Sequence, residues 1–186
     1  MSEVAQEPFV QRFLSTFSPP RPSRGKSGKD WWVSRVWSDY TRSWLDQHFR
    51  WIAEFPAGDG RRLDAAVWYR SSPGPIDVAL EWEWDNNESH RNFATGDFRK
   101  LLEVQARCGV ALLQTRAHTR GGIEKSDDAI AQIVDSNRKR NRDHRPVFVI
   151  DIRRVLHSAR AVEFVMQVHD IASGGVISGP RFAYSE

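Results

Sequence analysis

Two neighbouring stretches in the middle of the chain have the pattern of β-strands: the first is a short apolar run, and in the second large apolar residues alternate with small or acidic ones. The first stretch is RRLDAAVWY (61–69) and the second is IDVALEWEWDN (76–86), with Ser-Ser-Pro-Gly-Pro between them. Because this connection is short, we expect the two strands to pair antiparallel, as in a hairpin or meander. The start of the first strand, which holds Asp64, then lies beside the end of the second, which holds Glu81 and Glu83.

Periodicity predicts the other elements as well. Apolar residues recur at helical spacing over about 30–48, 96–108 and 125–139, so we expect a helix in each range. FRWIAEFPA is expected to form the first strand, and the apolar runs VALLQT and PVFVIDI are typical of central strands. VEFVMQVHDI and the segment around Phe182 are expected as edge elements. Antiparallel strands followed by helix–strand alternation predict an α/β fold, a mixed β-sheet flanked by helices.

The amino-terminal segment differs in composition from the rest of the chain. It contains SPPRPSRGKSGK, so we expect residues 1–28 to form a flexible N-terminal arm that is dispensable for folding. Residues 29–186 are then expected to form a single domain, which suits a chain of this length. An alternative follows from Phe9, Phe13 and Phe17, whose spacing of four residues would let a helix pack on the core.

Composition excludes several classes of protein. With 40% hydrophobic residues and 8 tryptophans the chain is not expected to be disordered. The single cysteine, Cys108, excludes an intramolecular disulfide and a cysteine zinc cluster, which favours a cytoplasmic location. No stretch approaches the roughly 20 apolar residues of a membrane span, so no membrane association is expected. The chain holds neither GxxxxGK nor GxGxxG, so no nucleotide cofactor is expected.

The carboxylates of the two middle strands are the main candidates for chemistry. Strand periodicity places Glu81 and Glu83 on one face, and the antiparallel pairing brings Asp64 beside them. Carboxylate oxygens are the ligands that hard divalent cations prefer, and buried carboxylates are costly without a cation or partner. We therefore expect Asp64, Glu81 and Glu83 to form a metal site. The alternative is the solvated face of an edge strand, which the apolar neighbours Ala65 and Leu80 disfavour.

The element order, and Asp64 followed 17 positions later (81 − 64) by Glu81, resemble the PD-(D/E)xK nuclease superfamily, the restriction-endonuclease-like fold. The resemblance covers roughly residues 30–115. It implies a nuclease-like domain that hydrolyses DNA phosphodiester bonds with Mg²⁺, or alternatively Mn²⁺, and it implies a homodimer. Glu83 stands where the superfamily has lysine, as in some type II restriction enzymes. It would then hold a second metal ion or orient the attacking water.

The same resemblance adds two catalytic candidates on the helix expected at 96–108. Lys100 stands where some superfamily members are thought to have moved the lysine, although helical spacing places it on the solvent face. Gln105, on the packing face, is similar to the helical glutamine near the metal in the recombination-nuclease branch. The tyrosine expected four residues later in that branch is replaced by Gly109.

A basic run, RKRNRDHR, is a candidate for nucleic-acid binding through Arg138, Lys139, Arg140 and Arg142. The alternative, which we prefer, is that basic residues favour the carboxyl end of a helix. Tryptophans expected near the first helix could stack on bases but are more typical of core anchors: Trp31, Trp32, Trp37 and Trp44. No histidine pair around His90 or His118 suggests zinc, and no triad partners accompany the nucleophile candidates: Ser71, Ser72 and Cys108.

Three functions remain open on these grounds. The first is a Mg²⁺-dependent DNA endonuclease. The second is a non-catalytic module of the same fold that binds nucleic acid or protein, with Glu83 marking loss of the lysine. The third is a glycosidase-like hydrolase using Glu81 and Glu83, although such pairs normally face each other across a cleft. Binding of a divalent metal would separate the first function from the others.

Overall fold

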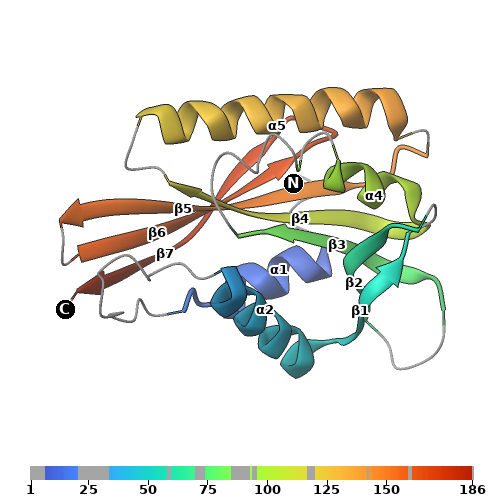
Figure 1. Ribbon diagram of the computed structural model, residues 1–186, viewed down its shortest axis with the longest axis horizontal. Coiled ribbons are helices and arrows are strands. Elements are labelled where there is room, and N and C mark those ends of the chain that lie inside the picture. Colours follow the sequence, from blue (N-terminus) through green and yellow to red (C-terminus); the bar gives the residue numbers. More distant parts are fainter. Residues whose placement is uncertain are drawn as a thin grey trace.

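A seven-stranded sheet with helices on both faces forms the protein, as the computed structural model in Figure 1 shows. The structure describes residues 7–20, 34–57, 60–69, 74–84, 93, 96–116, 120–141, 143–158 and 161–185. The helices are α1 (Pro8–Thr16), α2 (Ser34–His48), α4 (Asp97–Glu103) and α5 (Arg120–Arg140). The strands are β1 (Arg50–Pro56), β2 (Arg62–Trp68), β3 (Ile76–Glu83), β4 (Ala106–Arg116), β5 (Val147–Ser158), β6 (Ala161–Asp170) and β7 (Val176–Ser185).

Strand order in the sheet follows the chain, from β1 at one edge to β7 at the other. The first three strands form an antiparallel meander, β3, β4 and β5 run parallel, and β5, β6 and β7 are antiparallel again. The prediction of an α/β fold with a mixed sheet flanked by helices is therefore confirmed. β4 is central as expected, whereas β6, which was expected near an edge, lies between two strands.

The two faces of the sheet carry side chains of different size. Val67, Val78 and Leu80 belong to a core that is filled by aromatic side chains of α1 and α2. On the other face Ala66 and Ala79 belong to a second core together with residues of α4 and α5. Figure 1 shows α1 and α2 on one side of the sheet and α4 and α5 on the other. Small residues on β2 and β3 let α4 pack close to the strands that carry the acidic residues.

The expectation of a flexible arm over residues 1–28 is wrong for the part that the structure describes, because Pro8–Thr16 forms α1. Phe9, Phe13 and Phe17 are buried and pack against one another and against Trp44. A residue every four positions forms one stripe on a helix, and burying that stripe outweighs the Pro- and Ser-rich composition that follows it. The Tyr184 hydroxyl donates to the Pro19 carbonyl at 2.7 Å, which ties the segment after α1 to β7.

Two helix boundaries differ from expectation. α4 ends at Glu103 rather than near 108, because the chain from Ala106 onward pairs with β3 as strand β4. Gln105 therefore lies exposed between α4 and β4, and Cys108 is buried in β4. α5 begins at Arg120, earlier than the expected 125.

Trp37 and Trp44 are buried in the core, as expected of anchors. Several candidates lie outside the described residues: Trp31, Trp32, Ser71, Ser72, His90, His118 and Arg142. Among the described helices, none is long and apolar enough to cross a lipid bilayer.

Candidate functional site

Asp64 on β2 and Glu81 on β3 lie side by side on the sheet face that α4 covers. The register pairs Ala65 with Leu80, so continuing it by one residue places Asp64 opposite Glu81. The backbone N–H of Asp64 donates to Glu81 Oε1 at 3.3 Å, and the backbone N–H of Trp82 donates to Asp64 Oδ2 at 2.8 Å. Each carboxylate is thus held by the backbone of the strand that carries the other.

Burial and mutual repulsion disfavour two negative charges at this point. Glu81 is only 2% exposed. Burial, and next the charge of Asp64, raise the pKa of Glu81 to about 9. Burial also raises the pKa of Asp64, although the Trp82 N–H and Lys100 oppose that shift. Near neutral pH the pair therefore keeps a proton unless a further cation compensates its charge.

Lys100 of α4 reaches this pair from above the sheet. Its Nζ lies 3.1 Å from Glu81 Oε1 and 3.0 Å from Asp97 Oδ1, and it donates to the Arg62 carbonyl at 2.9 Å. These three contacts match the three N–H donors of an ammonium group. Burial alone would lower the pKa of Lys100, but Glu81 and Asp97 outweigh it and hold the pKa above its ordinary value. Lys100 is therefore a fixed positive charge beside the carboxylates.

The expected solvent-facing position of Lys100 is wrong, since its side chain is 13% exposed. The sequence pattern predicts a helix over 96–108 with Gln105 and Cys108 on its packing face. Because α4 ends at Glu103, its short packing face is made by Phe98 and Leu101, and Lys100 beside them extends toward β2 and β3.

Glu83 and Gln105 are not brought into this constellation. Glu83 lies two residues beyond Glu81 on β3, half-buried, with its Cα paired to Leu113 of β4. Within the described residues no three His, Cys, Asp or Glu side chains are grouped so that they could hold a metal ion. The expected three-carboxylate site is therefore reduced to the pair of Asp64 and Glu81. Gln105 is exposed on the connection after α4, away from any helical packing face.

Asp97 is a residue of the site that the sequence does not single out. Asp97 holds Lys100, and its signal in the sequence is the i, i+3 spacing of the two residues on one helix. Glu54, at the end of the first predicted strand, is expected from the sequence as an additional acid outside the metal site, but its side chain is exposed and pairs with Arg62. Glu54 of β1 falls opposite Asp64, between the pairs Ala53–Ala65 and Phe55–Leu63. Its φ of 49° is a left-handed conformation that side chains rarely adopt. Periodicity carries no signal for such a kink.

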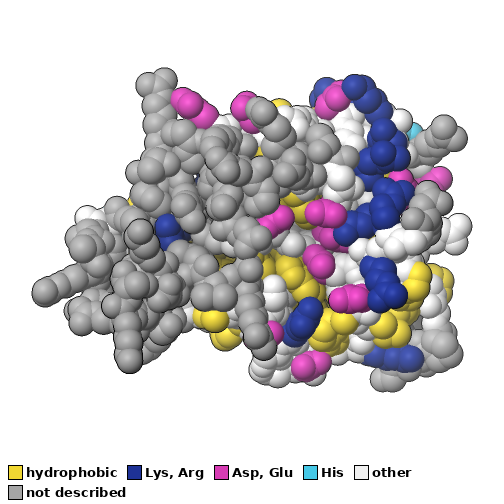
Figure 2. Space-filling model, viewed as in Figure 1, with side chains coloured by type: hydrophobic (Ala, Val, Ile, Leu, Met, Phe, Trp, Pro, Cys, Tyr) yellow, Lys and Arg dark blue, Asp and Glu magenta, His cyan; other side chains and the backbone are white. Residues whose placement is uncertain are grey.

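The first three residues of the basic run lie in the last turn of α5, as the helix-end interpretation predicted. Arg138, Lys139 and Arg140 all lie in that turn. Lys139 pairs with Asp135 at 2.7 Å. Figure 2 shows Lys and Arg side chains gathered along the side of the molecule where α4 and the end of α5 lie. This surface is on the same side of the sheet as α4, which covers Asp64 and Glu81.

Comparisons with protein-family models, with curated proteins and with solved structures each find no match to this chain. The functional argument therefore rests on the geometry of the site. The carboxylates of buried Glu81 and partly buried Asp64 offer hard oxygen ligands, and a fixed ammonium beside them can stabilise negative charge on a bound group. This combination suits hydrolysis of an anionic ester.

Proposed function

We propose that the protein is a metal-dependent endonuclease of the restriction-endonuclease-like fold, which hydrolyses DNA phosphodiester bonds at Asp64, Glu81 and Lys100. The observation that carries the proposal is the contact of Lys100 Nζ with Glu81 Oε1 at 3.1 Å, beside the paired carboxyl of Asp64. The order of helix α2, meander β1–β3, crossover helix α4 and parallel strand β4 supports the fold assignment. A homodimer, which the resemblance implies, stays a prediction.

The donor set fits a divalent cation such as Mg²⁺ or Mn²⁺. Mg²⁺ is typically held by one or two carboxylates together with waters and substrate phosphate oxygens, so Asp64 and Glu81 are sufficient protein ligands. The raised pKa of Glu81 is a second indication, because a cation there would replace the proton that the pair otherwise keeps. When bound, the ion supplies Lewis-acid polarisation of the phosphate and lowers the pKa of a coordinated water.

Lys100 supplies electrostatic stabilisation in this scheme and does not serve as a general base. Glu81 and Asp97 raise the pKa of Lys100 by more than burial lowers it, so the amine stays protonated at neutral pH. Asp97 and the Arg62 carbonyl hold the ammonium in place, which spares the cost of reorganising it as charge develops on the phosphate. Lys100 thus takes the part that the superfamily assigns to the lysine replaced here by Glu83.

A non-catalytic module is the second candidate. The ammonium of Lys100 already has three partners within the protein, so the constellation could be an internal ion-pair network that joins α4 to β2 and β3. The glycosidase interpretation is weaker, because Glu81 and Glu83 lie on one strand and do not face each other from different strands.

The deciding experiment combines metal binding with plasmid cleavage. Calorimetry with Mn²⁺ should show binding to the wild type and not to Asp64→Asn. With Mg²⁺ the protein should nick supercoiled DNA, and Glu81→Gln and Lys100→Met should each lower the rate at least 10²-fold. Asp46→Asn, an exposed acid on α2, is the matched control and should cut normally. Absence of both metal binding and cleavage would favour the non-catalytic module.

A further inference from the structure

Exposed arginines without partners gather at the end of α5. In the part of the chain that the structure describes, Arg138 and Arg140 form no hydrogen bond or ion pair, and both are exposed. Lys139, between them, pairs with Asp135 at 2.7 Å. A guanidinium carries five N–H donors, and phosphate oxygens accept them in pairs. The guanidinium N–H groups of this turn are therefore available to donate hydrogen bonds to an anionic ligand.

Other arginines near α4 have partners within the protein, either carboxylates or backbone carbonyls. Arg61 and Arg99 both pair with Glu103 of α4, and Arg62 pairs with Glu54 at 3.0 Å. Arg145 donates to the carbonyl of Val104. Carboxylates thus pair with the arginines around β2 and α4, whereas Arg138 and Arg140 at the end of α5 have no carboxylate partner among the described residues.

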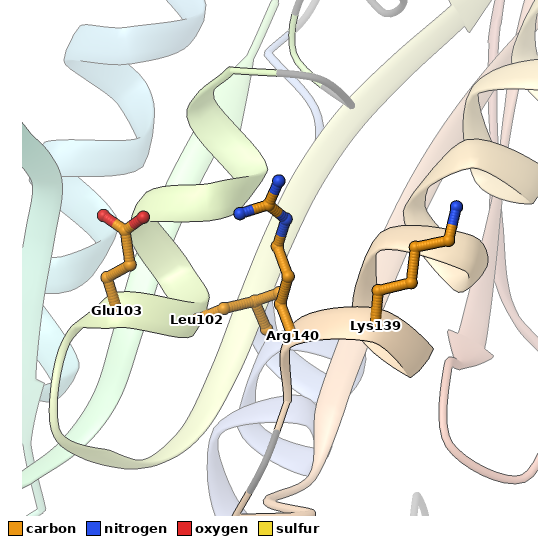
Figure 3. Close-up of a pocket in the computed structure, with 4 residues that line it drawn as sticks. All are labelled: Leu102, Glu103, Lys139 and Arg140. Atoms are coloured by element: carbon orange, nitrogen blue, oxygen red, sulfur yellow. The ribbon is translucent and has the colours of Figure 1, made fainter.

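A hollow connects the end of α5 to α4. It has a volume of about 390 Å³ and is lined by Leu102, Glu103, Lys139 and Arg140. Figure 3 shows the Arg140 side chain extending between Glu103 and Lys139, above Leu102. The volume is within the range of small-ligand pockets, about 300–1,000 Å³. Because Glu103 is compensated by Arg61 and Arg99, its charge does not exclude an anion from the hollow.

The hollow is close to the proposed active site. Glu103 lies three residues after Lys100 on α4, which is about 4.5 Å along the helix axis. A DNA strand carries one phosphate per about 3.4 Å of its helix axis. The spacing of phosphates on a strand is therefore similar to the spacing along α4 between Lys100 and Glu103, which lines the hollow together with Lys139 and Arg140.

We propose that Arg138, Lys139 and Arg140, at the hollow between α4 and α5, bind the phosphate backbone of the DNA strand that flanks the bond cut at Lys100. This inference rests on the proposed function for the identity of the ligand. The contrasting explanation is that the three cations only stabilise the carboxyl end of α5 through the helix dipole. In that case their removal would lower stability and leave DNA affinity unchanged.

Fluorescence anisotropy of a labelled 20-base-pair duplex, with Ca²⁺ in place of Mg²⁺ and at several salt concentrations, tests the inference. The test variant is Arg138→Gln/Arg140→Gln. Its matched control is Arg12→Gln/Arg42→Gln, which removes the same charge from exposed positions on α1 and α2, across the sheet. Each lost phosphate contact should reduce the slope of log K against log salt by about 0.9, so the test variant should lose about 1.8. The control should keep the wild-type slope.

The outcomes separate this inference from the proposed function. Equal effects in both double variants, no effect in either, or no duplex binding by the wild type would each overturn the inference. If the test variant keeps wild-type affinity while the protein still cuts DNA, the inference fails and the proposed function stands. If the test variant loses affinity but the wild type cuts nothing, the DNA-binding surface stands and the proposed function fails.

Discussion

Asp64 and Glu81 face each other across β2 and β3, and Glu81 Oε1 accepts a hydrogen bond from the Asp64 backbone N–H at 3.3 Å. Together with the bond from the Trp82 N–H to Asp64 Oδ2, this arrangement gives each carboxylate a backbone hydrogen bond, and Glu81 has the Lys100 ammonium as a further partner. A rigid pair of this kind is what a bound cation requires, because little rearrangement is needed on binding.

The stability of the metal-free protein should fall as pH rises through the neutral range. The native pKa of Glu81 is raised to about 9, above its ordinary value of 4.5, so between these values the native state binds more protons than the unfolded state. The free energy of unfolding then decreases with rising pH in that window. Urea unfolding between pH 5 and 9 should show a smaller decrease for Glu81→Gln, which cannot ionise. Parallel pH profiles for wild type and variant would contradict the shift.

Removing the ammonium from the site should destabilise the fold as well as affect chemistry. Lys100→Met leaves Glu81 and Asp97 without their common partner, and we expect a loss of about 1–3 kcal/mol in the free energy of unfolding. Lys139→Met breaks only an exposed pair with Asp135 and should cost less than about 1 kcal/mol. Adding Glu81→Gln to Lys100→Met should recover part of the loss. Equal losses in the two lysine variants would show that Lys100 is not engaged as described.

The amino-terminal helix should contribute strongly to stability. Phe13 is fully buried against Phe9, Phe17 and Trp44, so Phe13→Ala should lower the free energy of unfolding by about 3–5 kcal/mol. Arg12→Ala, its exposed neighbour, should stay within about 0.5 kcal/mol of wild type. Chemical denaturation measures both. A near-neutral Phe13→Ala would restore the interpretation of this segment as a dispensable arm.

Glycine should relieve the backbone strain at Glu54. This residue has a φ of 49°, and a side chain in that region costs about 1–2 kcal/mol. Glu54→Gly should therefore raise stability by about 0.5–1 kcal/mol, even though an exposed ion pair with Arg62 is lost. Ala53→Gly, at the neighbouring strand position, should instead lower stability by about 0.5–1 kcal/mol. A stabilisation of both variants, or of neither, in thermal unfolding would argue against strain at this position.

Adding a methyl group at Gly179, where β7 contacts α1, should lower the stability of the protein. A Cβ on Gly179 would lie 2.7 Å from Leu14 Cδ2 and 3.0 Å from Met166 Cβ, so Gly179→Ala should cost about 1–3 kcal/mol. Gly74→Ala, where nothing lies within 4 Å, is the matched control and should be near neutral. Adding Leu14→Ala should cost less in the Gly179→Ala background than in the wild type. Additive losses would show that the two positions are not in contact.

The strands that carry the acidic pair could be predicted from the sequence because the information is local. The apolar run at 61–69, the alternation along 76–86 and the short connection between them determine which side chains share a face and which residues lie opposite each other. These observations are sufficient to predict that Asp64 lies beside Glu81. The same reasoning placed Glu83 on their face, but a shared face does not bring a side chain into contact, and the described residues group no third ligand with the pair.

The position of Lys100 and the role of the amino-terminal segment were decided only by tertiary structure. Residues 104–108 continue the helical phase of α4, yet from Ala106 onward they belong to β4, whose pairing with β3 ends the helix. Phe98 and Leu101 still pack on the sheet as the periodicity predicts, and Lys100 beside them extends to Glu81. The phenylalanine stripe of α1 is a weak local signal that gains its stability from Trp44 and the sheet. When local periodicity favours a helix and distant strands offer pairing, the chain adopts the conformation that buries more apolar surface. The sequence of one segment does not reveal how much surface each conformation would bury in the folded protein.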